Sequence, residues 1–151
     1  MEQVPIPNDS LVKVNNLMWQ VIKQLTKSKK HILEQFGLTC SQFEILSALF
    51  HVSRTKEEII QIDLAEKTQI DPMTTSTILR NLQKKGLITR VRSLINTRTV
   101  IVQLTDKGED LYLKTMHVVN LRTELIYQNI NEKLLVSQLL ILSDKLNKLN
   151  S

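Results

Sequence analysis

The chain has 151 residues, of which 42% are hydrophobic but only 4% aromatic, with three glycines and one cysteine. This length predicts a single domain over residues 1–151, and the scarcity of glycine and aromatic residues indicates a helix-rich protein. No apolar run approaches the roughly 18 residues of a membrane span, the first seven residues lack the pattern of a secretory signal, and one cysteine allows no internal disulfide. We therefore expect a cytoplasmic protein with no membrane partner.

The formal net charge of +5 is concentrated in one part of the chain. Between Pro72 and Thr105 there is no Asp or Glu, while the rest of the chain holds 14 basic and 15 acidic residues, a net of −1. A local positive patch of this kind suits a polyanion, most often nucleic acid. The six basic residues of the acid-free segment are Arg80, Lys84, Lys85, Arg90, Arg92 and Arg98.

The sequence predicts a long first helix. Capping residues at 8–10 and a Gly at position 37 place it at about residues 10–36. Apolar residues recur along it at alternating steps of three and four, as in a coiled-coil seam. They are Leu11, Val14, Met18, Val21 and Leu25. A helix of about 26 residues is long for a small domain, so we expect part of it to pack outside the domain core.

A helix-turn-helix is predicted next. Thr39–Gln42 is a capping-box pattern that opens a helix ending near residues 51–54, and residues 59–60 could add a short strand. Residues 61–68 then form a short helix, followed by a turn of about three residues. Gln69 stands at the turn position where a left-handed backbone favours Gly.

The second helix of this unit is bounded by Asp71 as N-cap, Pro72 at the first position and Gly86 as C-cap. Its inner face is Thr75, Ile78, Leu79 and Leu82. Its outer face is Thr74, Ser76, Thr77, Arg80, Asn81 and Lys84. Short hydroxyls followed by long cations suit a helix whose N-terminus enters a DNA groove while its flank lies on phosphates. The alternative is a solvated helix that happens to be basic.

The acid-free segment continues into two runs of β-branched residues, 87–92 and 99–104, which predict a hairpin. A hairpin directly after such a helix is a wing, and its cations are Arg90, Arg92 and Arg98. We expect Arg98 to enter the narrow, electronegative minor groove, the alternative being a solvated turn residue. Leu94 and Ile95 are unexpected near a wing tip, and the sequence offers no account of them.

Two more helices are predicted after the wing. The first runs from about residue 106 to 130, and Asn131 caps the second. Leucines of the last helix step by four and three, which gives the C-terminal end of the chain a heptad seam like that of the first helix. They are Leu135, Leu139, Leu142, Leu146 and Leu149. We expect the two seams to meet their copies in a homodimer, the alternative being that one terminal helix packs on the other.

With these elements in order, the chain resembles the MarR family of bacterial winged helix-turn-helix regulators over nearly its whole length. The resemblance rests on Leu38-Thr39, Gln42-Phe43 and Leu46, Leu64-Ala65, Leu82 with Lys85-Gly86-Leu87-Ile88, and Leu104-Thr105-Asp106-Lys107-Gly108. It implies a homodimer that binds a pseudo-palindromic duplex and commonly represses. In the family, DNA binding is often relieved by small aromatic or anionic ligands, or by cysteine oxidation.

The wing departs from the family pattern at one position. The family usually carries an Asp-x-Arg motif there, and the matching residues of this chain are Asn96, Thr97 and Arg98. A carboxylate would hold the Arg by a charge-assisted hydrogen bond, whereas Asn offers a neutral one. We therefore expect Arg98 to be aimed less rigidly than in the family.

No enzyme, cofactor or metal site is predicted. The three His residues are far apart, no His, Cys or Asp group has metal-ligand spacing, and no catalytic triad, phosphate loop or catalytic carboxylate pair is present. Cys40 lies in the first turn of a helix, where a thiol can become reactive. The reactive Cys of the family's peroxide sensors lies earlier, in the first helix, so the resemblance favours an inert Cys40 over a redox sensor.

These predictions combine into a mainly α fold with a small β-hairpin wing. Residues 39–105 would form the winged helix-turn-helix, and residues 10–36 and 106–151 a helical dimerisation region. The expected function is sequence-specific binding of double-stranded DNA by a transcriptional regulator, a repressor released by a small-molecule effector. The predicted DNA contacts are Thr74, Ser76, Thr77, Arg80, Lys84, Arg90, Arg92 and Arg98. The alternative function is a winged-helix protein–protein interaction module whose basic face meets an acidic protein.

Overall fold

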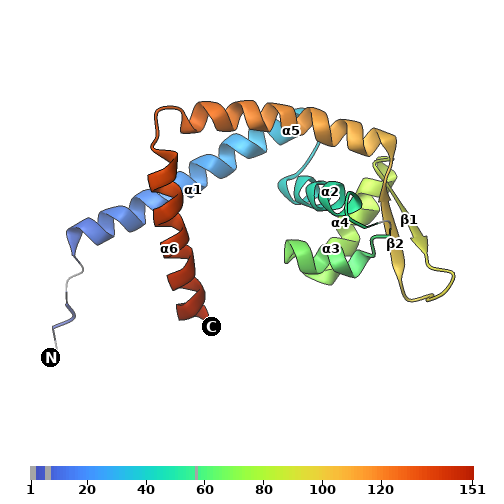
Figure 1. The fold of residues 1–151 in the computed structure, drawn as a ribbon, viewed down its shortest axis with the longest axis horizontal. Coiled ribbons are helices and arrows are strands. Elements are labelled where there is room, and N and C mark those ends of the chain that lie inside the picture. The colour runs from blue at the N-terminus through green and yellow to red at the C-terminus, as the bar shows by residue number, and fades with distance from the viewer. Residues whose placement is uncertain (1–2, 6–7, 57) are drawn as a thin grey trace. The chain divides into compact units, whose positions relative to one another are not determined.

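A computed structural model describes residues 3–5, 8–56 and 58–151 (Figure 1). Residues 1, 2, 6, 7 and 57 lie outside the described part, so most of the segment examined for a secretory signal is not covered. The elements are α1 (Asp9–Gln35), α2 (Cys40–Ser53), α3 (Gln61–Thr68), α4 (Pro72–Lys84), β1 (Ile88–Arg92), β2 (Val100–Leu104), α5 (Asp106–Tyr127) and α6 (Glu132–Asn150). The predicted fold class, mainly α with a small hairpin wing, is confirmed.

The chain divides into two compact units, one that ends at Met116 and one that spans His117–Ser151. The first unit holds α1 to α4, the hairpin and the first half of α5. In its hairpin, β1 pairs antiparallel with β2, with Ile88 opposite Leu104 and Arg92 opposite Val100. The second unit holds the end of α5 and α6, whose N-cap Asn131 accepts a hydrogen bond from the backbone of Leu134 at 3.1 Å.

The helix ends lie where the capping residues predicted them. The Thr39 side chain accepts from the Gln42 backbone at 3.1 Å, and the Gln42 side chain accepts from the Thr39 backbone at 3.0 Å, which completes the capping box. Gly37 ends α1 with a φ of +69°, and Leu38 N–H reaches back to the Leu33 carbonyl at 2.9 Å. These are the left-handed residue and the returning hydrogen bond of a glycine C-cap.

The core of the first unit lies among the end of α1, the helices α2, α3 and α4, and the hairpin. Its fully buried side chains include Leu33, Ile45, Leu46, Leu49, Leu64, Leu79, Leu82, Leu87 and Val102. Tyr112 of α5 completes this core, because its ring lies 5.5 Å from that of Phe43 and 4.9 Å from that of Phe50. Its hydroxyl is 3.1 Å from the Ser47 hydroxyl, so the buried phenol keeps a polar partner.

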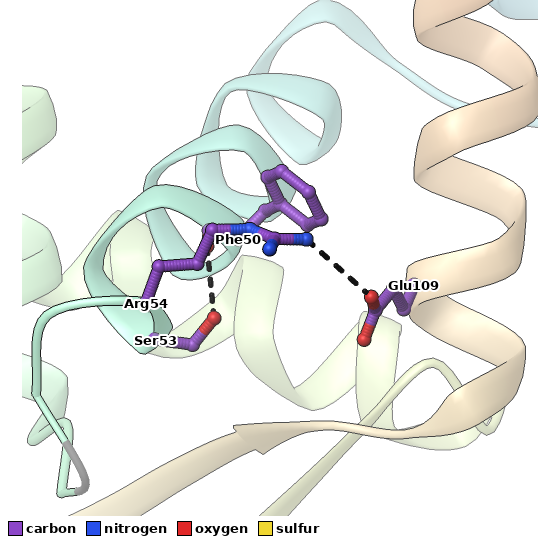
Figure 2. A network of polar contacts seen from close by, with 4 residues as sticks. All are labelled: Phe50, Ser53, Arg54 and Glu109. Atoms are coloured by element: carbon purple, nitrogen blue, oxygen red, sulfur yellow. Dashed lines mark hydrogen bonds and ion pairs between the residues drawn. The ribbon is translucent and has the colours of Figure 1, made fainter.

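A second contact joins the end of α2 to the start of α5 (Figure 2). The Arg54 guanidinium lies 4.2 Å from the centre of the Phe50 ring and 3.8 Å from a Glu109 carboxylate oxygen. Ser53 donates its hydroxyl to the Phe50 carbonyl at 2.8 Å. The ion pair is exposed and so adds little stability, but with the ring contact it orients Arg54 toward α5.

Two details differ from the sequence predictions. The short strand expected at residues 59–60 is a single bridge between Ile60 and Ile101, with Val102 N–H donating to the Ile59 carbonyl at 2.8 Å. It ends there because α3 begins at the next residue. The fifth helix stops at Tyr127 and not near residue 130, because Asn129 takes a left-handed φ of 63°.

The start of α5 explains the Thr105-Asp106-Lys107-Gly108 motif. The Thr105 hydroxyl donates to the Gly86 carbonyl at 2.7 Å and accepts from Gly108 N–H at 3.0 Å. Thr105 N–H donates to the Leu87 carbonyl at 3.1 Å. A Cβ on Gly108 would lie 1.9 Å from that same carbonyl oxygen. Only glycine lets α5 approach the chain between α4 and β1 so closely.

We predict that Gly108→Ala lowers the free energy of unfolding by about 2–3 kcal/mol, because the clash is with backbone and cannot be relieved by a rotamer change. Gly37→Ala is the matched control. Its Cβ would meet nothing within 4 Å, so only the left-handed φ should cost about 1 kcal/mol. Urea denaturation of both variants measures the difference, and equal losses would contradict the close approach at Gly108.

Candidate nucleic-acid interface

The helix α4 is held by contacts at its N-terminus. Asp71 accepts the Thr74 backbone N–H at 2.9 Å and the Thr74 hydroxyl, and these bonds keep the pKa of the Asp71 carboxyl below its ordinary value. Before it, Gln69 adopts the left-handed conformation with a φ of 56°. The turn therefore has the geometry that the sequence predicted, with Gln in place of Gly. Thr75 is buried and donates to the Ile70 carbonyl at 3.2 Å, which fastens α4 to this turn.

The outer face of α4 is exposed as predicted. Thr74, Thr77, Arg80 and Lys84 are exposed, and Ser76 is half-buried. The hydroxyl protons of Thr74 and Thr77 are already donated, to Asp71 and to the Met73 carbonyl at 3.2 Å. In this arrangement these two hydroxyls can accept a hydrogen bond from a base but have no proton left for a phosphate.

Sequence reasoning missed Met73. Its side chain is 82% exposed at the N-terminal end of α4. The helical period places it one turn before Thr77 and two turns before Arg80, so the signal was present in the spacing. An apolar side chain at this end of a groove-binding helix can contact a thymine methyl group.

Arg90 is more than a surface cation. Its Nη2 donates to the Gln61 side chain at 2.8 Å, which ties β1 to the start of α3. Its Nε is buried and finds no hydrogen-bond partner within the described residues. Burial lowers the pKa of Arg90, and the nearby charge of Arg80 lowers it further. Arg80 and Arg90 therefore lie close enough to form one cationic area, while Arg90 also has a structural role.

The wing holds the other two predicted arginines in different settings. Arg92 donates to the Thr97 carbonyl at 3.4 Å across the hairpin, and Arg98 is exposed. Asn96 accepts the backbone N–H of Arg98 at 3.2 Å rather than its guanidinium. The expected side-chain bond between the two residues is thus replaced by a backbone one, which orders the turn.

Two lysines near α4 are held by carbonyl groups. Lys85 Nζ donates to the Gly37 carbonyl at 2.6 Å, and Lys107 Nζ donates to the Lys85 carbonyl at 2.9 Å. Both carbonyls lie at helix C-termini, where a cation interacts favourably with the dipole. Arg80 Nε donates to the Ser76 carbonyl of its own helix at 3.4 Å. Of the six cations in the acid-free segment, Arg80, Lys84 and Arg98 are therefore the least committed to contacts with other elements.

The described residues contain no group of three or more His, Cys, Asp or Glu that could hold a metal ion. Cys40 is a half-buried free thiol. None of the helices in the described part of the chain is long and apolar enough to cross a membrane.

A helix-turn-helix with a capped, acid-free second helix, followed by a two-stranded wing that carries cations, defines a winged helix-turn-helix protein. Residues 27–115 match the family described as Transcriptional regulator SarA/Rot. The chain belongs to this family of transcriptional regulators. The resemblance to MarR-type regulators that the sequence suggested is confirmed.

Three comparisons illustrate the likeness. The uncharacterized HTH-type transcriptional regulator YdcH of Bacillus subtilis is 29% identical over 103 residues, which cover 68% of this chain and 70% of the relative. The S. aureus MepR–DNA complex has a TM-score of 0.77 at 24% identity, covering 89% of this chain and 96% of MepR. The transcriptional repressor CouR, bound to a 23-mer DNA duplex, has a TM-score of 0.76 at 20% identity, covering 93% and 98%. The match covers a smaller share of some other curated relatives, for example 56% of the length of the uncharacterized HTH-type transcriptional regulator YdgJ of Bacillus subtilis.

We predict that Asp71→Ala lowers the melting temperature at neutral pH and that this loss disappears in acid. The folded-state pKa of Asp71 lies below the ordinary 3.8, so the carboxylate stabilises the fold above that pH and the stabilisation is lost as the pH falls through the folded-state value. Asp71→Asn, which keeps an acceptor for the cap, should lose less stability at neutral pH. Because neither variant carries the titrating carboxyl, the difference from wild type should shrink in acid by the same amount for both. Melting curves at several pH values test this; a loss for Asp71→Ala that is equally large in acid would refute it.

Proposed function

We propose that this transcriptional regulator binds double-stranded DNA sequence-specifically in the cytoplasm and acts as a repressor. The observation that carries the proposal is the acid-free surface of α4 and the wing, attached to a helix-turn-helix. The chain from Pro72 to Thr105 has six cations and no carboxylate, while the rest is nearly balanced. The complexes of MepR and CouR with DNA support the same use of a related fold. No enzymatic reaction forms part of the proposal.

In this proposal, residues 39–105 are the DNA-binding region. The N-terminal end of α4 enters the major groove with Thr74, Ser76 and Thr77 toward base edges, while Arg80 and Lys84 meet phosphates. Arg90 and Arg92 add positive charge along β1, and Arg98 enters the minor groove. The hydroxyls of Thr74 and Thr77 serve as acceptors, because their protons are donated within the helix cap and the helix.

We propose further that the protein is a homodimer on a pseudo-palindromic operator, with residues 10–36 and 106–151 as the dimerisation region. In the described structure, α6 has no buried residue, although it carries Leu139, Leu142 and Leu146. Apolar residues of α1, including Leu17 and Val21, are also exposed. Apolar surface of this extent usually marks an interface. Dimerisation would set two α4 helices about one DNA turn apart, roughly 34 Å; sedimentation of the DNA-free protein as a monomer would contradict it.

The release of DNA by a small-molecule effector is the remaining part of the proposal. A cavity of about 280 Å³ lies between the start of α3 and the wing, and it is lined by Ile60, Gln61, Ile62, Ala65, Pro72, Arg98, Thr99 and Val100. An anionic, largely apolar molecule seated there would neutralise Arg98. A screen in which no such compound weakens DNA binding would oppose this route.

The alternative function is a protein–protein interaction module, which the exposed apolar wing tip favours. A gel shift with the region upstream of its own gene, and with duplexes selected from a random pool, separates the two functions. Salt-sensitive and sequence-selective binding supports the regulator. The absence of binding at low salt, together with capture of an acidic partner, supports the module.

We predict that Arg80→Ala weakens binding to a selected duplex by roughly tenfold and lowers the salt slope, the dependence of log K on log salt concentration, by about one. The reason is the loss of one phosphate contact and its released counterion. Lys23→Ala is the control, since Lys23 is an exposed cation of α1 outside the acid-free segment. Fluorescence anisotropy at several salt concentrations gives both quantities. An unchanged affinity and slope for Arg80→Ala would remove Arg80 from the interface.

A further inference from the structure

The tip of the wing presents two large apolar side chains to solvent. Leu94 is 100% exposed and Ile95 is 99% exposed. Val91 of β1 is exposed as well. Because the two tip residues contribute nothing to the core, packing within this unit does not account for them.

The tip that carries them is ordered by its own hydrogen bonds. The Ser93 hydroxyl oxygen accepts from the backbone of Ile95 at 3.2 Å and of Asn96 at 3.3 Å. Ser93 N–H donates to the Thr99 carbonyl at 2.8 Å, and Asn96 accepts from the Arg98 backbone. The turn is therefore preorganised, so little conformational entropy remains to be lost when the apolar pair is buried against a partner.

The surroundings of the pair indicate the chemistry of that partner. Arg92 and Arg98 lie on either side of the tip in sequence, and no carboxylate occurs between Pro72 and Thr105. The partner must therefore offer an apolar surface with negative charge at its rim. The minor groove of DNA offers this combination where a base step opens, since sugars form its walls, the opened step exposes apolar base faces, and phosphates line its edges. The same acid-free segment also forms α4, so one duplex can contact both α4 and the wing tip.

We propose that Leu94 and Ile95 enter the minor groove as an apolar wedge that partly unstacks a base step and bends the operator, while Arg98 lies in the same groove beside them and Arg92 meets a flanking phosphate. Side chains of this kind kink DNA by roughly 20–90° in proteins that use them. The inference rests on the proposed DNA-binding function and adds a second source of sequence selectivity to it. Flexible pyrimidine–purine steps open at lower cost, so the wedge selects sequence without hydrogen bonds to bases.

The test compares the wild-type chain with Leu94→Ser/Ile95→Ser on a duplex that the wild type has selected from a random pool. Both residues are fully exposed, so the double variant should melt at the wild-type temperature. Anisotropy at several salt concentrations gives the affinity and its salt slope, and sedimentation gives the oligomeric state of the DNA-free protein. Bending is measured by the mobility of fragments with the site at the middle or the end, and unstacking by 2-aminopurine fluorescence at the contacted step. Val4→Ser, which changes another apolar residue that is 87% exposed, is the matched control.

The wedge predicts an affinity loss on the order of tenfold for the double variant, together with loss of the bend and of the 2-aminopurine signal. The salt slope should stay unchanged, because no phosphate contact is removed. Arg98→Ala should do the reverse and lower the slope by about one while the duplex stays bent.

Other outcomes overturn the inference in distinguishable ways. If the wild type binds the duplex and the double variant binds and bends it equally well, the wedge is wrong while the proposed function stands. If the double variant instead changes the oligomeric state of the DNA-free protein, the tip docks on a second copy. If the wild type selects no duplex, the proposed function and the wedge fail together.

Discussion

The close approach of α5 to the chain between α4 and β1 is the contact on which the arrangement of the binding surface depends. Gly108 leaves no room for a Cβ beside the Leu87 carbonyl, and the same carbonyl accepts the Thr105 backbone N–H. The Thr105 hydroxyl adds a bond to Gly86. One short segment thus fixes the end of α4, the start of β1 and the end of β2 to one another. Since α4 and the wing would contact different grooves, the fold must fix their relative position before the protein binds DNA.

The charge of this surface is divided between structural and free cations. Lys85 and Lys107 satisfy helix-end carbonyls, and Arg90 holds β1 to α3 through Gln61. Arg80, Lys84 and Arg98 remain exposed. All of them contribute to the electrostatic attraction of a polyanion, which acts over about a Debye length. Lys84 and Arg98 can change their contacts when phosphates arrive, and Arg80 would give up only the 3.4 Å bond from its Nε to the Ser76 carbonyl of its own helix. Lys85, Lys107 and Arg90 would first have to give up a bond that joins two elements of the fold.

Most of the fold was predictable because its signals are local. Asp71, Thr39 and Gly37 act on residues within five positions of themselves, so the helix ends follow from the sequence alone. The left-handed turn at Gln69 was predictable for the same reason, even without glycine. The Gln61–Arg90 and Gly37–Lys85 bonds join residues 29 and 48 positions apart, and no pattern in one sequence predicts such pairs. The roles of the predicted DNA contacts stay predictions, although Thr74, Thr77, Arg80 and Lys84 are exposed on α4 and Ser76 is half-buried.

The tip of the wing is ordered by hydrogen bonds although Asn96 stands where the family pattern has Asp. Asn96 was expected to loosen Arg98, because a neutral amide makes a weaker bond to a guanidinium than a carboxylate does. The amide oxygen accepts a backbone N–H instead, and Ser93 accepts two more. Order in the tip is therefore obtained from the backbone and does not constrain the Arg98 side chain. This leaves the Arg98 side chain free to adjust within the groove, while the backbone that carries Leu94 and Ile95 is held in place. A rigid apolar tip beside a movable cation can respond to the stiffness of a duplex as well as to its charge.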